Sequence, residues 1–371
     1  MSPHCDDEVK KAVANFLLQH FILRQVEEYG FPHALHDHRH RGGEPRRARY
    51  AHHLHGRQRR VRPMTEPLFD KIAIVGLGLI GSSIARGVKA RGIASTVVGY
   101  DLSADVRARA RELGFCDAVA DSPEAAVAGA SLVVLAVPVG ATAEAVEAAA
   151  PNLEDGAIVT EAGSVKAAVI RKVLDVLPAR AAFVPGHPIA GTEHSGADAG
   201  FAELFEGRWC ILTPCERSTD EAVAKVTAFW RALGSEVETM TPEHHDMVLA
   251  ITSHIPHLIA YNIVGTAADM EKVTRSEVIK FSAGGFRDFT RIAASDPVMW
   301  RDVFLNNKEA VLEMLGRFSE DLTALQRMIR WEDGQALLQL FTRTRAIRRG
   351  IIEAGQDTEV ADFGRPYGHK N

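Results

Sequence analysis

Between residues 67 and 240, short apolar runs alternate with stretches in which apolar residues recur at helical spacing. Glycine, proline or small polar residues separate the runs from the stretches that follow. We expect strands at 71–75, 96–100, 131–138, 157–160, 182–184, 209–215 and 236–240. We expect helices at 82–90, 103–114, from 122, from 164 to 177 and 219–233. Alternation of this kind predicts a doubly wound parallel sheet.

The pattern changes at Pro242. Beyond this residue the strand signals stop, and apolar residues recur with a period of about 3.6, as in 247–251 and 311–315. We therefore predict a first domain over 67–240 and a mostly α-helical second domain over 241–350, followed by a tail over 351–371.

A glycine turn joins the first predicted strand to the first predicted helix. Its residues are Gly76, Leu77, Gly78, Leu79, Ile80 and Gly81. Glycines at this spacing make a tight turn, let a pyrophosphate approach the backbone and let the helix pack on the strand. Asp101 ends the next strand, where its carboxylate can bind ribose hydroxyls and repel a 2′-phosphate. The pattern predicts a dinucleotide site that prefers NAD to NADP. Arg107 and Arg109 favour NADP, but on the helix after Ser103 we expect them to be solvated.

Length and composition set broad limits. The chain has 371 residues, of which 46% are apolar, so about two domains are expected. No uninterrupted apolar run reaches the ~20 residues of a membrane span, and residues 1–30 lack a secretory signal. We therefore expect a cytoplasmic protein that binds no membrane. The four cysteines show no paired spacing, so we predict neither a metal site nor disulfides.

Residues 1–63 differ from the rest in charge, with 12 Lys or Arg against 7 Asp or Glu, and they hold nine of the 16 histidines. They lack aromatic interleaving and ligand spacing, so we predict no nucleic-acid or metal binding there. The segment 29–35 resembles the C-terminal part of histidinol-phosphate aminotransferases. Residues 36–43 resemble the continuation of that sequence read out of frame. We interpret 1–63 as a non-native or disordered leader, and Met64 as the native start.

The segment 186–196 places His187 on an apparent glycine- and proline-defined turn after the apolar run 182–184. A histidine titrates near neutral pH, so it can serve as a catalytic base. Ser164 follows another strand of the same predicted sheet and should share its carboxyl edge, either as a ligand to substrate or as a helix N-cap. Lys166 either contacts a ligand or lies in solvent.

Two segments of the helical half carry further candidates. Ser253, His254 and His257 lie on a helix that Pro256 should bend, and the two histidines share a face. They either line a pocket or bond to neighbouring carbonyls. The glycines 284–285 form an apparent hinge before Arg287 and Arg291, and arginine suits the recognition of a carboxylate.

Together these motifs resemble the prephenate dehydrogenase family, which includes arogenate and cyclohexadienyl dehydrogenases. The resemblance covers about 70–350 and rests on the glycine turn, 163–166, 187–196, 253–257, 285–293 and 299–300. It implies a Rossmann-type domain followed by an all-α substrate and dimerisation domain, in a homodimer. It also implies NAD-dependent oxidative decarboxylation of prephenate to 4-hydroxyphenylpyruvate in tyrosine biosynthesis, with arogenate as a second or alternative substrate.

The same resemblance implies roles for individual residues. His187 would accept the proton of the ring hydroxyl, Ser164 would orient that hydroxyl, and Arg291 would pair with the ring carboxylate. The remaining pocket residues would be His257, Thr192, Glu193, Ser253 and His254, with Asp288 and Trp300 contributed by the facing subunit. Glu161 and Ala162 depart from the family pattern, which has Asp and a larger residue there.

Two other classes remain open. A β-hydroxyacid dehydrogenase would use a lysine of its helical half, yet Lys272, Lys280 and Lys308 stand in no such motif. A non-enzymatic NAD sensor would need the glycine turn but would have no use for His187 and Arg291 together.

Overall fold

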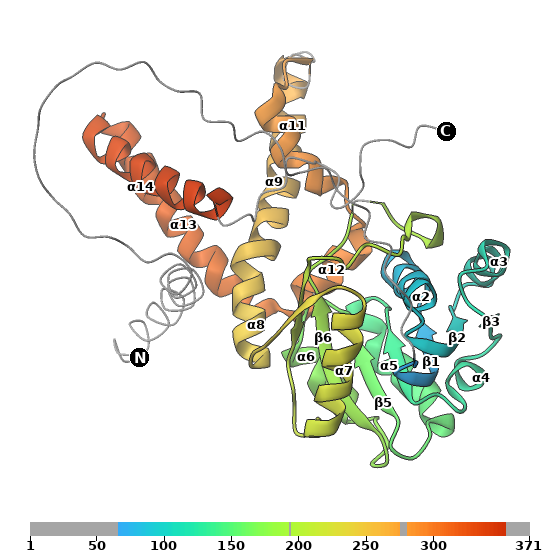
Figure 1. The fold of residues 1–371 in the computed structure, drawn as a ribbon. Coiled ribbons are helices and arrows are strands. Elements are labelled where there is room, and N and C mark those ends of the chain that lie inside the picture. The colour runs from blue at the N-terminus through green and yellow to red at the C-terminus, as the bar shows by residue number, and fades with distance from the viewer. Residues whose placement is uncertain (1–65, 193, 275–279, 354–371) are drawn as a thin grey trace, which may run out of the picture. The chain divides into compact units, whose positions relative to one another are not determined.

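The computed structural model of this protein describes residues 66–192, 194–274 and 280–353 (Figure 1). The predicted leader over 1–63, most of the predicted tail over 351–371 and Glu193 lie outside these residues. Residues 66–343 belong to one compact unit.

Eight strands form one sheet in the order β3-β2-β1-β4-β5-β6-β7-β8. They are β1 (Phe69–Val75), β2 (Ala94–Tyr100), β3 (Ala118–Val119), β4 (Leu132–Leu135), β5 (Ile158–Glu161), β6 (Ala182–Pro188), β7 (Trp209–Leu212) and β8 (Glu236–Thr239). Neighbouring strands run parallel, except that β6 and β7 pair antiparallel. The predicted doubly wound α/β fold is confirmed, and the β6–β7 pair is its departure from an all-parallel sheet.

Strand β6 changes partner along its length. Its first part, 182–185, pairs parallel with β5, and Gly186–Pro188 then pair with Cys210–Leu212 of β7. His187 therefore lies within the strand, and the prediction that it stands on a turn was wrong. The chain stays extended through the glycine and proline because β7 supplies a partner for this end of the strand, which continues to the bond from Ile189 N to Trp209 O.

Helices cover both faces of the sheet, so the strands are buried on both sides. The helices are α2 (Leu79–Arg91), α3 (Ala104–Leu113), α4 (Pro123–Val127), α5 (Thr142–Ala149), α6 (Ala167–Leu174) and α7 (Asp220–Ala232). Alternate residues of β1 enter different cores: Ile72 and Ile74 pack in the core with α2 and α7, while Ala73 and Val75 pack in the core with α4, α5 and α6. This alternation follows from the period of two along a strand.

The helical half begins directly after β8. It consists of α8 (Pro242–Leu249), the π-helical turn η4 (Ala250–His254), α9 (Ile255–Thr274), α11 (Gly284–Thr290), the 3-10 turn η5 (Arg291–Ala294), α12 (Pro297–Asn306), α13 (Lys308–Arg330) and α14 (Gly334–Glu353). Gly284 and Gly285 lie in the first turn of α11 and form no separate hinge. The irregularity expected at Pro256 takes the form of the π-helical turn just before it.

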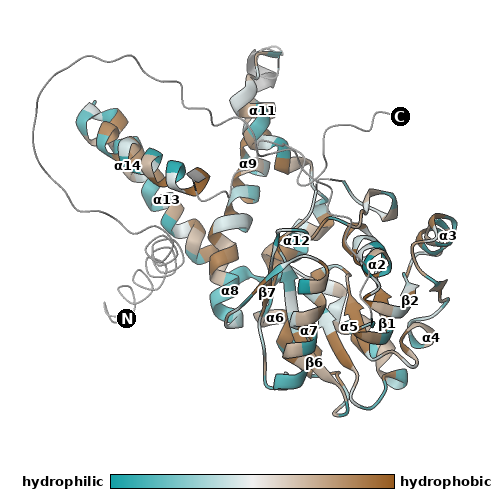
Figure 2. Ribbon diagram, in the orientation of Figure 1, coloured by the Kyte–Doolittle hydropathy of each residue, from teal (hydrophilic) through white to brown (hydrophobic). Residues whose placement is uncertain are grey.

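The core of this half is small. Ala250, Ile255, Val311 and Met314 form its own buried cluster, and Trp300 and Val303 of α12 are buried in a core of the first half. Figure 2 shows apolar segments beside polar ones along α8, α9 and α13. The helical segment Pro242–Met270 is long and apolar enough to cross a membrane by length and composition alone, a test that a core helix of a soluble protein also passes.

Candidate active site

The glycine turn brings backbone amides to the start of α2. Gly76 has φ +93°, and a Cβ there would collide with the carbonyl oxygen of Ala136. A Cβ on Gly81 would collide with the carbonyl oxygen of Gly76, so two of the three glycines are required by close packing. Gly78, the N-cap of α2, has no atom within 4 Å of its Cβ position and supplies no side-chain cap. The helix N-terminus is therefore open to a phosphate, as a dinucleotide requires.

Asp101 lies where β2 ends, beside this turn. Its Oδ2 accepts a hydrogen bond from Leu77 N at 2.8 Å, and its Oδ1 accepts one from Ser103 N at 2.9 Å. Arg107 donates to the carbonyls of Asp101 and Leu102, and Arg109 pairs with Asp198 and Glu112. Both arginines, which we expected to be solvated, are thus held by protein groups. The residues at this site fit NAD.

His187 and Ser164 lie at the same edge of the sheet. His187 is near the carboxyl end of β6 and half-buried, and Ser164 lies in the connection from β5 to α6, also half-buried. Parallel strands bring their carboxyl ends to one edge, where open α/β sheets bind ligands. The glycine turn after β1 opens at the same edge, so the structure places this turn, Ser164 and His187 at one edge of the sheet.

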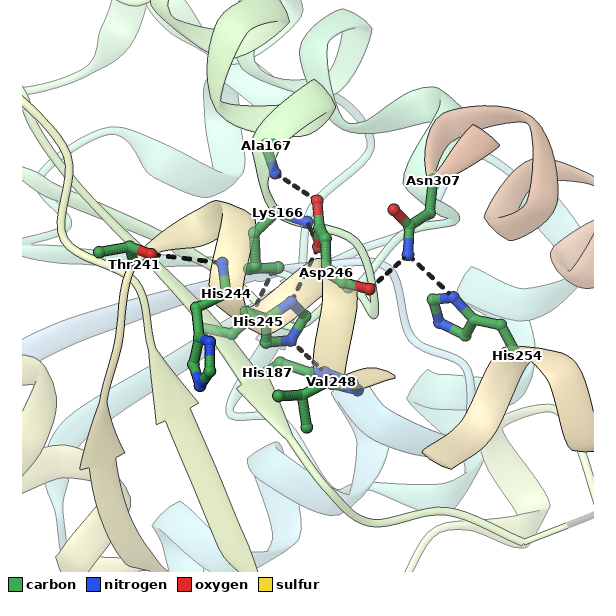
Figure 3. Close-up of polar contacts among 12 residues, drawn as sticks. Lys166, Ala167, His187, Thr241, His244, His245, Asp246, Val248, His254 and Asn307 are labelled. Atoms are coloured by element: carbon green, nitrogen blue, oxygen red, sulfur yellow. Dashed lines mark hydrogen bonds and ion pairs between the residues drawn. The ribbon is translucent and has the colours of Figure 1, made fainter. Parts of the chain in front are cut away.

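A chain of polar side chains stands behind His187 (Figure 3). Its Nδ1 lies 2.8 Å from Nε2 of His245, and Nδ1 of His245 lies 2.9 Å from Oδ1 of Asp246. Both partners come from α8 and are buried. Neither residue was predicted, and the one signal for them is that three polar residues, His244, His245 and Asp246, follow one another in the first helix of the helical half.

Asp246 also caps α6. Its Oδ1 accepts from Lys166 N at 2.8 Å, and its Oδ2 accepts from Ala167 N at 2.9 Å (Figure 3). These amides open the helix and need acceptors from elsewhere. The alternative that Ser164 is the N-cap was wrong: the cap residue is Lys166, which makes no side-chain cap bond, and a carboxylate from another helix replaces it.

The Lys166 side chain is fully buried and neither lies in solvent nor reaches toward it. Its Nζ pairs with the buried carboxylate of Glu161 and donates to the carbonyl oxygen of Gly186 at 2.6 Å. Burial raises the pKa of Glu161 and lowers the pKa of Lys166, and their mutual contact opposes both shifts. Glu161, which departs from the family pattern, thus holds the lysine that fastens the backbone next to His187.

The two histidines of the helical half have different surroundings. His254 is fully buried, and its Nδ1 accepts from Asn307 Nδ2 at 3.1 Å, while the same amide group donates to the carbonyl of Asp246 at 2.8 Å. His257 is half-buried, bonds through Nδ1 to the carbonyl of Ser253 and stacks on Trp300 at 3.7 Å between ring centroids. Trp300 therefore contacts the predicted pocket within its own chain, without a facing subunit.

Arg291 opens η5 and lies near His257, whose pKa its positive charge helps to lower. Arg287 pairs instead with Asp288 at 3.3 Å on the exposed surface. Thr192 is half-buried and bonds through its hydroxyl to His194 N at 3.2 Å. Glu193 lies outside the described residues.

Burial keeps the histidines around the site neutral. It lowers the pKa of His187 well below the ordinary value, with the charges of His245, Lys166 and His254 acting in the same direction. Burial likewise lowers the pKa of His245 well below that value and the pKa of His254 to about 4. A neutral imidazole can accept a proton, so the arrangement suits a base.

A nucleotide-binding sheet with a neutral histidine at its carboxyl edge is the arrangement of an NAD-dependent dehydrogenase. Residues 84–239 match the family model described as prephenate dehydrogenase, nucleotide-binding domain, and residues 241–343 match the one described as prephenate dehydrogenase, dimerization domain. The chain belongs to the prephenate dehydrogenase family.

Individual relatives agree with this assignment. Cyclohexadienyl dehydrogenase of Zymomonas mobilis is 46% identical over 284 residues, which are 76% of this chain and 97% of that protein. Prephenate dehydrogenase of Bacillus subtilis is 36% identical over 76% of each chain. The solved structure of prephenate dehydrogenase from Aquifex aeolicus, in complex with hydroxyphenyl propionate and NAD+, has a TM-score of 0.72 at 35% identity, covering 76% of this chain and 98% of that one. The predicted family, enzyme class and cofactor are confirmed.

Proposed function

We propose that this protein oxidises and decarboxylates prephenate to 4-hydroxyphenylpyruvate in tyrosine biosynthesis, with His187 as the catalytic base. The position of His187 carries this proposal. It lies at the carboxyl edge of the sheet, near the start of α2, with Nδ1 engaged by His245 at 2.8 Å. Its other ring nitrogen is left for a substrate.

The chemistry requires one proton acceptor and one hydride acceptor. NAD, when bound, takes the hydride from the ring carbon that bears the hydroxyl. His187 takes the proton of that hydroxyl as the carbon is oxidised, and Ser164 hydrogen-bonds to the same oxygen. The ring carboxylate leaves as CO₂, the electron pair of the broken carbon–carbon bond completes the aromatic ring, and the ring oxygen takes the proton back from His187.

The substrate anchors come from the helical half. We assign the ring carboxylate to Arg291, because its guanidinium lies close to His257 and a guanidinium suits a carboxylate. His257, close to Arg291 and held by Trp300, would contact the side chain of the substrate. The other proposed pocket residues are Thr192, Glu193, Ser253 and His254. His254 would act from a buried position behind the pocket.

The cofactor site divides into two parts. The residues 76–81 would hold the pyrophosphate at the start of α2, and Asp101 would hold the adenosine ribose. We propose a preference for NAD over NADP, since the Asp101 charge faces the ribose position and Arg107 is engaged by backbone carbonyls. The domain boundary would fall at about 240, where β8 ends at Thr239 and α8 begins at Pro242.

We further propose a cytoplasmic homodimer that binds neither membranes nor nucleic acid. The helical half exposes large apolar side chains that a second copy would cover, among them Leu312, Leu322 and Ile329. The apolar segment Pro242–Met270 carries Asp246 and the buried His245 and His254, which are costly inside a bilayer.

Interpreting 1–63 as a leader stays a prediction, and recovering native peptides from it would contradict that prediction.

NADH formation by the full chain, with prephenate and arogenate offered separately, tests the activity. We expect turnover of prephenate, and the ratio to arogenate would define the subclass. Arogenate turnover alone would make the protein an arogenate dehydrogenase, and turnover of neither would reject the proposed reaction.

His187→Asn tests the base. We expect kcat to fall by ~10²–10⁴, the usual contribution of a general base. The Kd for NAD, measured by calorimetry, should stay the same because His187 is not among the proposed cofactor contacts. Full activity in this variant would reject His187 as the base.

A further inference from the structure

We infer that His245 and Asp246 hold His187 in the tautomer that leaves the lone pair on its Nε2. This inference rests on the proposed role of His187 and assigns two positioning residues that act through it. The observation that carries it is the continuous chain of contacts from His187 to His245 to Asp246, at 2.8 Å and 2.9 Å (Figure 3).

The direction of the hydrogen bonds follows from counting protons. A carboxylate can only accept, so Nδ1 of His245 must carry a hydrogen and donate to Asp246. A neutral imidazole has one N–H, so Nε2 of His245 then holds a lone pair. Nδ1 of His187 must donate to that lone pair, which leaves Nε2 of His187 as the acceptor.

Burial raises the pKa of Asp246, and the groups around the carboxylate oppose this shift and favour the ionised form from which the count begins. Besides His245, two backbone amides donate to it, those of Lys166 at 2.8 Å and Ala167 at 2.9 Å. Three donors converge on one carboxylate, and a charged acceptor makes stronger hydrogen bonds than a neutral one. Asp246 also sits at the N-terminus of α6, where a negative charge is favoured.

The rest of the environment favours neutral imidazoles. Lys166 and His254 face both His187 and His245, and His244 adds its effect on His245. Glu161 is paired with Lys166 and does not bond to either ring. With both rings neutral, one tautomer satisfies every contact in the chain.

These hydrogen bonds couple the two halves of the molecule. The base comes from β6 of the sheet, but its orientation is set by α8, and the same Asp246 carboxylate fastens α8 to the start of α6. A shift of α8 would release the cap of α6 and the tautomer of His187 together. Docking of the helical half is therefore a condition for a competent base.

Nitrogen-15 NMR on histidine-labelled protein tests the tautomer directly. The signals that disappear in His187→Asn identify His187. In the wild-type protein at neutral pH, we expect Nδ1 of His187 to be protonated and Nε2 to be unprotonated. A protonated Nε2 in the wild-type protein would overturn the inference without any variant of α8.

Two substitutions at the same position separate hydrogen bonding from packing. His245→Leu removes the acceptor, and we expect kcat for prephenate to fall on the order of 10²-fold with NAD affinity within about twofold. His245→Gln offers a side-chain carbonyl to Nδ1 of His187 and should recover most of that loss. Equal losses in both variants, or full activity in His245→Leu, would count against the inference.

Asp246→Asn tests the origin of the chain. Its amide nitrogen cannot accept a hydrogen bond, so one of the three donors loses its acceptor, and the negative charge that orders the chain is lost. We expect a loss of kcat together with a less ordered tautomer of His187 in the NMR spectrum. His244→Leu, on the same helix but outside the chain, is the control and should keep wild-type kcat.

The proposed function and this inference can fail separately. An active His187→Asn protein would reject the base itself. An inactive His187→Asn protein beside a fully active His245→Leu protein would reject only the positioning role. Should His245→Leu fail to fold, the wild-type NMR pattern and His245→Gln still decide.

Discussion

The nucleotide-binding half and the helical half differ in what covers their apolar surfaces. In the first half, helices lie on both faces of the sheet, and the apolar residues of β1 and β4 are buried in two large cores. In the second half, the described residues form one small buried cluster of their own, while Leu312, Leu322 and Ile329 of α13 are exposed by 55%, 43% and 64%. The first half completes its core within one chain, while the second leaves apolar side chains exposed, which the proposed homodimer would cover.

The halves also differ in the polar groups they bury. The first half buries a matched pair, Glu161 and Lys166. The second buries His245 and His254, which are uncharged only while the pH stays above their lowered pKa values. The helical half should therefore be the more sensitive to both dilution and acid.

The largest effect should come from charging the exposed face of α13. Leu322 and Ile329 are seven residues apart and share a face. Replacing both with Glu should weaken the proposed homodimer by about 10³-fold or more. Each substitution removes an apolar side chain that the second copy would cover and adds a charge. Sedimentation equilibrium measures the association.

The control pair for that experiment is Ala324→Glu with Arg327→Glu, on the other side of the same helix. It should leave the dimer intact, and NAD binding should survive in both double variants. Equal dissociation by both pairs, or by neither, would contradict the comparison of the two halves.

Acid should destabilise the protein through His254. The folded chain keeps this residue neutral down to its pKa of about 4, while the unfolded chain binds a proton below the ordinary value of 6.5. Stability is therefore present above about pH 6.5 and lost as the pH falls toward 4. The total is on the order of 3 kcal/mol, of which about 2 kcal/mol is lost by pH 5.

Urea unfolding at pH 7.5 and pH 5 checks this prediction. In His254→Asn, the difference between the two pH values should shrink by about 2 kcal/mol. The half-buried His244, replaced by Asn, is the matched control and should keep the wild-type difference. A His254→Asn protein with an unchanged pH difference would disprove the assignment.

The smallest effects should separate binding from stability in the first half. Gly78 has φ −70° and open space at its Cβ position, so Gly78→Ala should fold normally but weaken NAD binding by about 10-fold, where the phosphate meets the backbone.

Gly114, the C-cap of α3, has φ +64°, so Gly114→Ala should cost about 1 kcal/mol of stability and leave NAD binding unchanged. Calorimetry and thermal unfolding measure the two, and the opposite pattern would contradict them.

Local pattern predicted much of the first half. Helices were expected from 103, 122 and 219, and Ser103, Ser122 and Thr219 each accept a hydrogen bond from the helix that begins there. Where a second strand intervened, pattern failed: His187 looked like a turn residue because Gly186 and Pro188 usually break strands, yet β7 pairs with this segment.

The site residues also differ in whether the local sequence pattern could predict them. The glycine turn and Asp101 could be predicted as a cofactor site, because the spacing of these residues along the chain sets the geometry that such a site needs. Lys166 was misjudged because its partner Glu161 is five residues away on a strand, and its other hydrogen-bond acceptor, the carbonyl of Gly186, lies on a different strand. Burial of this kind has no local sequence signal.

By itself, the sequence determined the doubly wound fold, the family, the NAD site and the identity of the histidine at the sheet edge, because each depends on short-range spacing. Only the tertiary structure decided how that histidine is held. His187 meets a ring 58 positions away in the sequence, and α6 is capped by a carboxylate 80 positions away. Such contacts arise when helices pack on a sheet, since packing, and not spacing along the chain, brings these groups within hydrogen-bond distance.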